Sequence, residues 1–113
     1  MKQRIFDRFA ETGLIKSADL PAQGLASADR VRLIRRGNEY FNSGDIETAR
    51  RVFQTTGYSD GLIRVGDRYL GARRPVDALK MYWLAHDRKR SEPLVEKAVL
   101  AIRRLLAEEE KDE

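Results

Sequence analysis

Thirteen consecutive residues carry the pattern that decides the fold: Gly37-Asn38-Glu39-Tyr40-Phe41-Asn42-Ser43-Gly44-Asp45-Ile46-Glu47-Thr48-Ala49. Their opening Gly-x-x-Tyr returns 29 residues later as Gly66-Asp67-Arg68-Tyr69. The same offset pairs Ala49 with Ala78 and Phe53 with Tyr82. Self-similarity at a fixed period is the signature of a repeat architecture, in which each unit packs on its neighbour. The sequence therefore predicts two copies of one structural unit.

Apolar residues recur at helical spacing along the whole chain, and no alternating β-branched run indicates a strand. We expect an all-α protein whose helices begin and end at local capping signals. The expected helices are residues 2–11, 27–42, 46–56, a fourth that ends at Leu70, 75–87, and a last one that ends near Glu109. Ser27 is the expected N-cap of the helix over 27–42, and Asp45 caps the helix over 46–56, which Gly57 stops. Ser59 or Asp60 caps the fourth helix, Pro75 starts the fifth, and Ser91 with Pro93 opens the last.

The last predicted helix carries a long apolar stripe: Leu94, Val95, Ala98, Val99, Ile102, Leu105 and Leu106. Two repeats alone leave open hydrophobic ends, so this helix is expected to cap one of them. Trp83 is expected to pack on it.

The pattern resembles the tetratricopeptide repeat, a unit of two antiparallel helices with a small residue and an aromatic in the first and an Ala and an aromatic in the second. The resemblance covers residues 30–90. It implies antiparallel helix hairpins, with units at about 30–58 and 59–88 followed by the capping helix. The chain departs from the family in its 29-residue period, where 34 is usual, and in having Leu33 and Leu62 at the position of the usual tryptophan.

The chain divides by composition into an N-terminal helix and connector over 1–26, the helical domain over 27–107, and an acidic tail over 108–113. Residues 1–26 are interpreted as a cap, as a docking arm, or as a segment that fills the protein's own groove through Ile5, Phe6, Phe9, Leu14 and Ile15. The tail has five acids and one lysine, so the rest of the chain accounts for a net charge of +8 within an overall +4. Such a basic surface attracts an acidic protein segment or nucleic acid.

The resemblance also implies a partner-binding groove lined by the first helices of the two units. Carried over position by position, the candidate residues are Val31, Ile34, Asn38, Phe41, Asn42, Ile63, Arg64, Asp67 and Leu70, with Asp60 beside them. Some relatives hold a peptide carboxylate with a lysine and two asparagines, and of those three only Asn38 matches here. The groove is better suited to an amphipathic helix or an extended apolar segment.

Little in the sequence indicates catalysis or a cofactor. The chain has no cysteine and one histidine, His86, which excludes disulfides, thiolate chemistry and histidine-cluster metal sites. Gly57-Tyr58-Ser59-Asp60-Gly61 has the spacing of a nucleophile elbow, but a predicted helix precedes it where a strand is required, so a turn between repeats is favoured. Gly61 to Gly66 has P-loop glycine spacing, but Asp67 and Arg68 follow where Lys and Ser or Thr are needed.

We therefore expect a non-enzymatic adaptor or scaffold domain in the cytoplasm, with no cofactor and no membrane insertion, that binds an apolar or acidic segment of a partner protein. The alternatives are an arginine-rich binder of nucleic acid or another anionic surface, and a self-assembling structural module. No run of apolar residues is long enough for a transmembrane helix.

Overall fold

The computed structural model describes residues 19–112, and these residues contain helices and connections but no strand. The helices are α2 (Ser27–Asn42), α3 (Ile46–Thr56), α4 (Ser59–Gly71), α5 (Pro75–Leu84) and α6 (Arg88–Asp112). The predicted all-α class is confirmed. Residues 1–18 and 113 lie outside the described residues, and so do the helix expected over 2–11 and the start of the connector.

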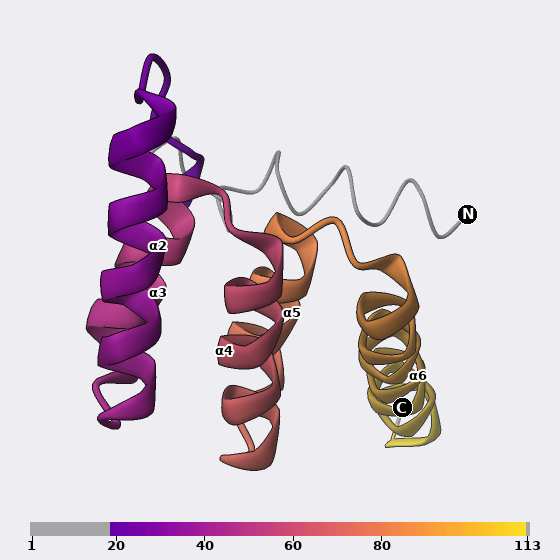
Figure 1. The fold of residues 1–113 in the computed structure, drawn as a ribbon. Helices are drawn as coiled ribbons and strands as arrows, with labels where there is room; N and C mark the ends of the chain where they lie inside the picture. Colours follow the sequence, from indigo (N-terminus) through magenta and orange to yellow (C-terminus); the bar gives the residue numbers. More distant parts are fainter. Residues whose placement is uncertain (1–18, 113) are drawn as a thin grey trace.

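Each helix packs on its neighbours in the chain, most extensively α2 with α3 and α4 with α5, and less extensively α3 with α4 and α5 with α6. The result is a row of elements in two layers, with α2 and α4 in front of α3 and α5 in Figure 1. The long helix α6 closes the row at the end away from α2.

The repeated glycines and aromatics make the same contact in both halves of the row. A Cβ built on Gly37 of α2 would lie 2.7 Å from the Phe53 ring of α3, and one on Gly66 of α4 would lie 2.6 Å from the Tyr82 ring of α5. Glycine is needed at both positions because any side chain would displace the ring. Phe53 also lies against Gly61 of α4, where a Cβ would be 2.5 Å from its ring. The Phe53 ring therefore joins three helices.

These rings belong to a core that runs through α3, α4 and α5. Its fully or largely buried members are Ala49, Phe53, Leu62, Val65, Tyr69, Ala78, Met81, Tyr82 and Ala85. A smaller cluster joins α5 to α6 through Leu79 and Val95, with Trp83, Leu94 and Val99 packed against it. The prediction that Trp83 packs on the last helix is confirmed.

Two predicted helix boundaries are confirmed together with their causes. The side chain of Asp45 accepts the Thr48 N–H at 3.2 Å and so caps the N-terminus of α3. Gly57 ends α3 with a φ of 65°, a left-handed conformation that L side chains rarely adopt.

The predicted caps of α2 and α4 are wrong. Ser27 and Ser59 are the first residues of their helices, and the preceding Ala26 and Tyr58 make no side-chain cap hydrogen bond. Asp60 lies in the first turn of α4, where its charge complements the helix dipole.

The boundary between the last two helices also differs from the prediction. α5 ends at Leu84, three residues before the expected Asp87, and His86 has a φ of 58° in the connection. α6 then starts at Arg88, because the Asp87 side chain accepts the Arg90 N–H at 3.1 Å. Ser91, the expected cap, is buried inside the helix, and Pro93 follows it within the helix.

Several predicted apolar positions are exposed in the structure. On α6 the stripe is buried only at its start, whereas Ala98, Ile102, Leu105 and Leu106 are exposed. Val31 and Val76 are exposed as well. α6 also continues to Asp112, beyond the predicted end near Glu109.

Candidate functional site

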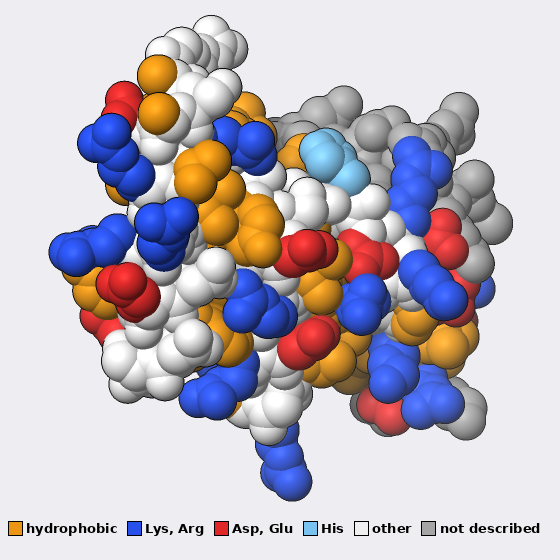
Figure 2. All heavy atoms as spheres, viewed as in Figure 1, with side chains coloured by type: hydrophobic (Ala, Val, Ile, Leu, Met, Phe, Trp, Pro, Cys, Tyr) orange, Lys and Arg blue, Asp and Glu red, His pale blue; other side chains and the backbone are white. Residues whose placement is uncertain are grey.

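A groove lies on the face formed by α2, α4 and the start of α6. It has a volume of about 800 Å³ and is open to solvent. Its wall is made by Asn38, Asn42, Tyr58, Asp60, Ile63, Arg64, Asp67 and Arg90. In Figure 2, basic and acidic side chains alternate over this side of the molecule, so the surface is mixed in charge.

Arg64 is the most constrained side chain of the groove. Its guanidinium donates a hydrogen bond to Oδ1 of Asn38, which ties α4 to α2. It also lies over two aromatic rings, 5.1 Å from the centroid of Phe41 and 5.8 Å from that of Phe53. Among residues 19–112 no carboxylate forms an ion pair with it. Arg64 is therefore a half-buried cation held in place by neutral groups.

The charges at the α6 end of the groove neutralise one another. Arg90 forms ion pairs with Asp87 at 2.6 Å and with Asp67 at 3.8 Å. Asp67 also accepts a hydrogen bond from the hydroxyl of Tyr82 at 2.7 Å. Burial raises the pKa of Tyr82 above its usual value, and the bond to Asp67 raises it further. The tyrosine hydroxyl therefore stays protonated and fixes the carboxylate on the groove wall.

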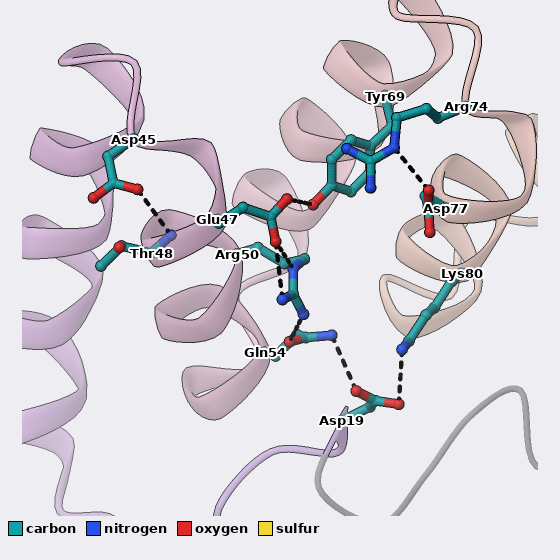
Figure 3. A network of polar contacts seen from close by, with 10 residues as sticks. All are labelled: Asp19, Asp45, Glu47, Thr48, Arg50, Gln54, Tyr69, Arg74, Asp77 and Lys80. Atoms are coloured by element: carbon teal, nitrogen blue, oxygen red, sulfur yellow. Dashed lines mark hydrogen bonds and ion pairs between the residues drawn. The ribbon is translucent and has the colours of Figure 1, made fainter.

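A second polar network joins α3, α4 and α5 (Figure 3). The hydroxyl of Tyr69 donates to Glu47 at 2.5 Å, and this bond lowers the pKa of Glu47. Burial, together with the bond to Glu47, raises the pKa of Tyr69 to about 12. Arg50 bridges Glu47 to Gln54, with Nε donating to the carboxylate at 3.1 Å and NH1 donating to the amide oxygen at 2.8 Å.

Asp19 extends this network to the chain before α2. Its carboxylate is 3.0 Å from the Lys80 ammonium of α5, and it accepts a hydrogen bond from Gln54 of α3 at 3.5 Å. The small hollow beside the network holds about 170 Å³ and is lined almost entirely by these paired groups. Its polar groups already bond to one another, so the network joins helices and does not present free binding groups.

The structure brings five of the nine predicted partner-binding residues to the groove wall: Asn38, Asn42, Ile63, Arg64 and Asp67. The other four do not line it. Ile34 and Phe41 are half-buried, with Phe41 beneath Arg64, and Val31 and Leu70 are exposed elsewhere. Sequence reasoning missed Tyr58 and Arg90. The 29-residue offset does not predict Arg90, because the equivalent position of the second unit is Gly61, which does not line the groove.

Neither the nucleophile-elbow stretch nor a group of metal-binding side chains forms a chemical site within residues 19–112. The Gly57 to Gly61 stretch connects α3 to α4, so a helix stands where a nucleophile elbow requires a strand. Within residues 19–112 no three His, Cys, Asp or Glu side chains are grouped so that they could hold a metal ion. In the same range no helix combines the length and apolar character needed to cross a bilayer.

Comparison with known proteins identifies a relative but no described activity. No family model matches the chain. No solved structure matches it. An uncharacterized protein of Treponema pallidum (strain Nichols) is 40% identical over 92 residues, which span 81% of this chain and 88% of the relative. Identity at that level over most of both chains establishes common descent, and the chain therefore belongs to the same family as the Treponema pallidum protein.

Proposed function

We propose that this protein is a non-catalytic adaptor that binds a helix or an extended segment of a partner protein in the groove between α2, α4 and α6. The observation that carries the proposal is the open hollow of about 800 Å³ with side chains of three helices on its wall. We place it in the cytoplasm as part of a larger assembly.

The two-layer arrangement supports a tetratricopeptide-like classification within this proposal. Gly37 with Phe53 and Gly66 with Tyr82 make equivalent contacts, each between the first and second helix of a unit. Stacked helix pairs of this kind leave their first helices side by side on one face. Extended binding surfaces in repeat proteins are built in this way.

The groove chemistry favours a partner segment with both polar and apolar side chains. Arg64 is ordered before any ligand arrives, so binding to it costs less side-chain entropy than binding to a free surface arginine. It offers a cation without a carboxylate partner among the described residues, which suits an acidic or carbonyl group. Ile63 and Tyr58 add apolar surface beside it. A polypeptide meets these requirements better than a small apolar molecule.

A site-specific photocrosslinking experiment tests the proposal. A photoreactive phenylalanine analogue placed at Asn42, on the groove wall, should crosslink to one protein in a nuclease-treated lysate, identified by mass spectrometry. The same analogue at Arg51, an exposed residue of α3 outside the groove, should not crosslink to that protein.

Two arginines on α4 supply matched variants. Arg64→Gln should abolish the Asn42 crosslink, because Arg64 lines the groove, whereas Arg68→Gln should leave it intact, because Arg68 lies outside it. Circular dichroism establishes that both variants stay folded. Equal crosslinking from Asn42 and Arg51, or loss of the partner after nuclease treatment, would contradict the adaptor proposal.

A further inference from the structure

The apolar stripe of α6 is longer than the helix that covers it. α5 has 10 residues and α6 has 25, so α6 extends about 22 Å past α5. Residues of α6 at successive steps of four, three and four form one line on its surface: Val95, Val99, Ile102 and Leu106. Val95 is 2% exposed and Val99 is half-buried, whereas Ile102 and Leu106 are 56% and 55% exposed. The line that packs on α5 therefore continues uncovered beyond it.

The uncovered part of the stripe forms a cluster at the end of the row of helices (Figure 1). Leu105 is 62% exposed and lies beside Ile102 and Leu106 on the surface of α6. Clustered, exposed aliphatic side chains are characteristic of contact surfaces. We call Ile102, Leu105 and Leu106 the α6 patch.

The charged residues around the α6 patch are separated by sign along the helix. Residues 97–107 contain three basic residues and no acidic residue, and the next three residues are Glu108, Glu109 and Glu110. All six of these charged side chains are exposed. A helix with a positive block followed by a negative block is complementary to a second copy of itself that runs in the opposite direction. A second copy in parallel and in register would bring like charges together.

Two of these charges lie on the same side of the α6 patch. Arg103 precedes Leu106 by three residues and Glu110 follows it by four, which turns them about 60° and about 40° from Leu106 in the same direction. In an antiparallel pair of helices with a twofold axis at Leu106, the same sides of the two helices face each other. Arg103 of one copy is then within about 1.5 Å of the level of Glu110 of the other, measured along the helix axis.

The length of the uncovered helix agrees with the same register. With Leu106 on the twofold axis, Asp112 at the end of one α6 reaches the level of Leu100 of the other, because both are six residues from Leu106. The cluster between α5 and α6 extends along α6 to Val99. Each α6 therefore ends where α5 of the other copy begins to cover the stripe, so the two helices can pair without displacing α5.

We propose that two copies of this chain form an antiparallel dimer through the α6 patch, with Leu106 at the twofold axis and Arg103 of each copy beside Glu110 of the other. Both copies use the same surface, so the contact closes as a dimer and does not propagate. About 13 residues of each copy take part, fewer than the roughly 20–30 of a standard interface, so we expect a dissociation constant in the micromolar range. Arg90 of the groove lies outside the contact, and the proposal does not depend on what the groove binds.

Sedimentation velocity of the full-length protein tests the proposal. Over concentrations from about 1 μM to about 1 mM, which bracket a micromolar dissociation constant, the weight-average mass should rise from 13.0 kDa towards twice that value and no further. Arg64→Gln, which changes the groove, should leave this rise unchanged.

Two leucines of α6 supply a matched pair of variants. Leu106 is on the α6 patch and is 55% exposed, whereas Leu100 is 53% exposed but is turned about 120° around the helix from it. Leu106→Gln should raise the dissociation constant of the dimer more than about tenfold, because each copy loses a buried leucine side chain. Leu100→Gln should change it little. Glutamine forms helix as readily as leucine, so both variants preserve α6.

Two arginines test the register. Arg103→Glu should raise the dissociation constant about tenfold, because the change acts twice in the dimer, and adding Glu110→Arg to it should restore dimerisation. Arg104→Glu is the matched control, since Arg104 is turned about 160° from Leu106.

Crosslinking tests the antiparallel orientation, because the chain has no cysteine of its own. Under mild oxidation, a mixture of the Arg103→Cys and Glu110→Cys proteins should form a disulfide-linked dimer. Neither protein alone should do so, because identical positions are about 9 Å and about 12 Å apart along the helix axis.

Four results would each overturn the proposal. A protein that stays monomeric at 1 mM does not use the α6 patch to bind a second copy. Equal weakening by Leu106→Gln and Leu100→Gln would place the contact elsewhere, and loss of the dimer in Arg64→Gln would place it in the groove. Disulfide formation by either cysteine variant alone, at the rate of the mixture, would exclude the antiparallel register.

Discussion

Replacing Gly61 by alanine should destabilise the protein, although the same change usually stabilises a helix. The new Cβ would lie 2.5 Å from Cγ of Phe53 and 2.6 Å from both Cδ atoms. Carbon atoms in contact are normally about 3.5–4.0 Å apart, so three ring atoms would be too close by about 1 Å. The Phe53 ring is 0% exposed and also lies against Gly37, so it has no free space to move into.

The magnitude follows from two opposing contributions. Alanine inside a helix is favoured over glycine by about 1 kcal/mol. Overpacking a filled core costs about 1–3 kcal/mol, and the short contacts at Gly61 place it at the upper end of that range. We therefore expect the free energy of unfolding to fall by about 2 kcal/mol. For a domain of this size the corresponding fall in Tm is about 10 °C.

Urea denaturation followed by circular dichroism at 222 nm measures this difference. Gly71→Ala is the matched control, because Gly71 ends the same helix and a Cβ there has no neighbour within 4 Å. It should be neutral or stabilising by up to about 1 kcal/mol. Phe53→Leu should partly rescue Gly61→Ala, which a double-mutant cycle would detect. A Gly61→Ala protein as stable as the wild type would refute the packing of Phe53 against α4.

Three further predictions test the polar contacts. Asp45→Ala should lower the free energy of unfolding by about 1 kcal/mol, because α3 loses its N-cap. Ser59→Ala should change the free energy of unfolding little, because the Ser59 side chain caps no helix. Urea denaturation of both variants measures the difference. The pKa of Tyr69 is raised to about 12, so the folded state favours the neutral hydroxyl, and this stabilisation is present below pH 10 and lost between pH 10 and 12. Tyr69→Phe should therefore lose less stability than the wild type over that range, and parallel curves would contradict this. The hydrogen bond from Tyr69 lowers the pKa of Glu47. The ionised Glu47 therefore contributes to the free energy of unfolding above its ordinary pKa of 4.5, and this contribution is lost as the pH falls below that value. Glu47→Gln should make the free energy of unfolding depend less on pH in the acid range.

The helix boundaries that could be predicted from the sequence are those set by adjacent residues. Asp45 and Gly57 act within one turn of their own positions, so their effect does not depend on distant packing. The start of α6 was missed because Asp87 and Ser91 are both good N-cap residues, and only the packing on α5 buries Ser91 and leaves Asp87 as the cap.

The candidate site could be predicted only in part, for a related reason. The 29-residue offset correctly brings α2 and α4 to one face, so Asn38 and Arg64 meet. The offset does not determine how far each helix is rotated. Ile34 and Phe41 are half-buried and do not line the groove, and Phe41 lies beneath Arg64. Likewise, the apolar stripe of α6 predicts that this helix packs on another element. It does not show that α5 is too short to cover the whole stripe.

The packing of each helix on its neighbours in the chain also has a consequence for how fast the chain folds. Forming each helix pair requires closure of only a short connection, such as Ser43 to Asp45 between α2 and α3. The entropy of closing such loops is small, and proteins dominated by local contacts fold in microseconds to milliseconds. We expect stopped-flow refolding to be complete within milliseconds, without the slow phase that long-range pairing imposes on β-sheet proteins of this length.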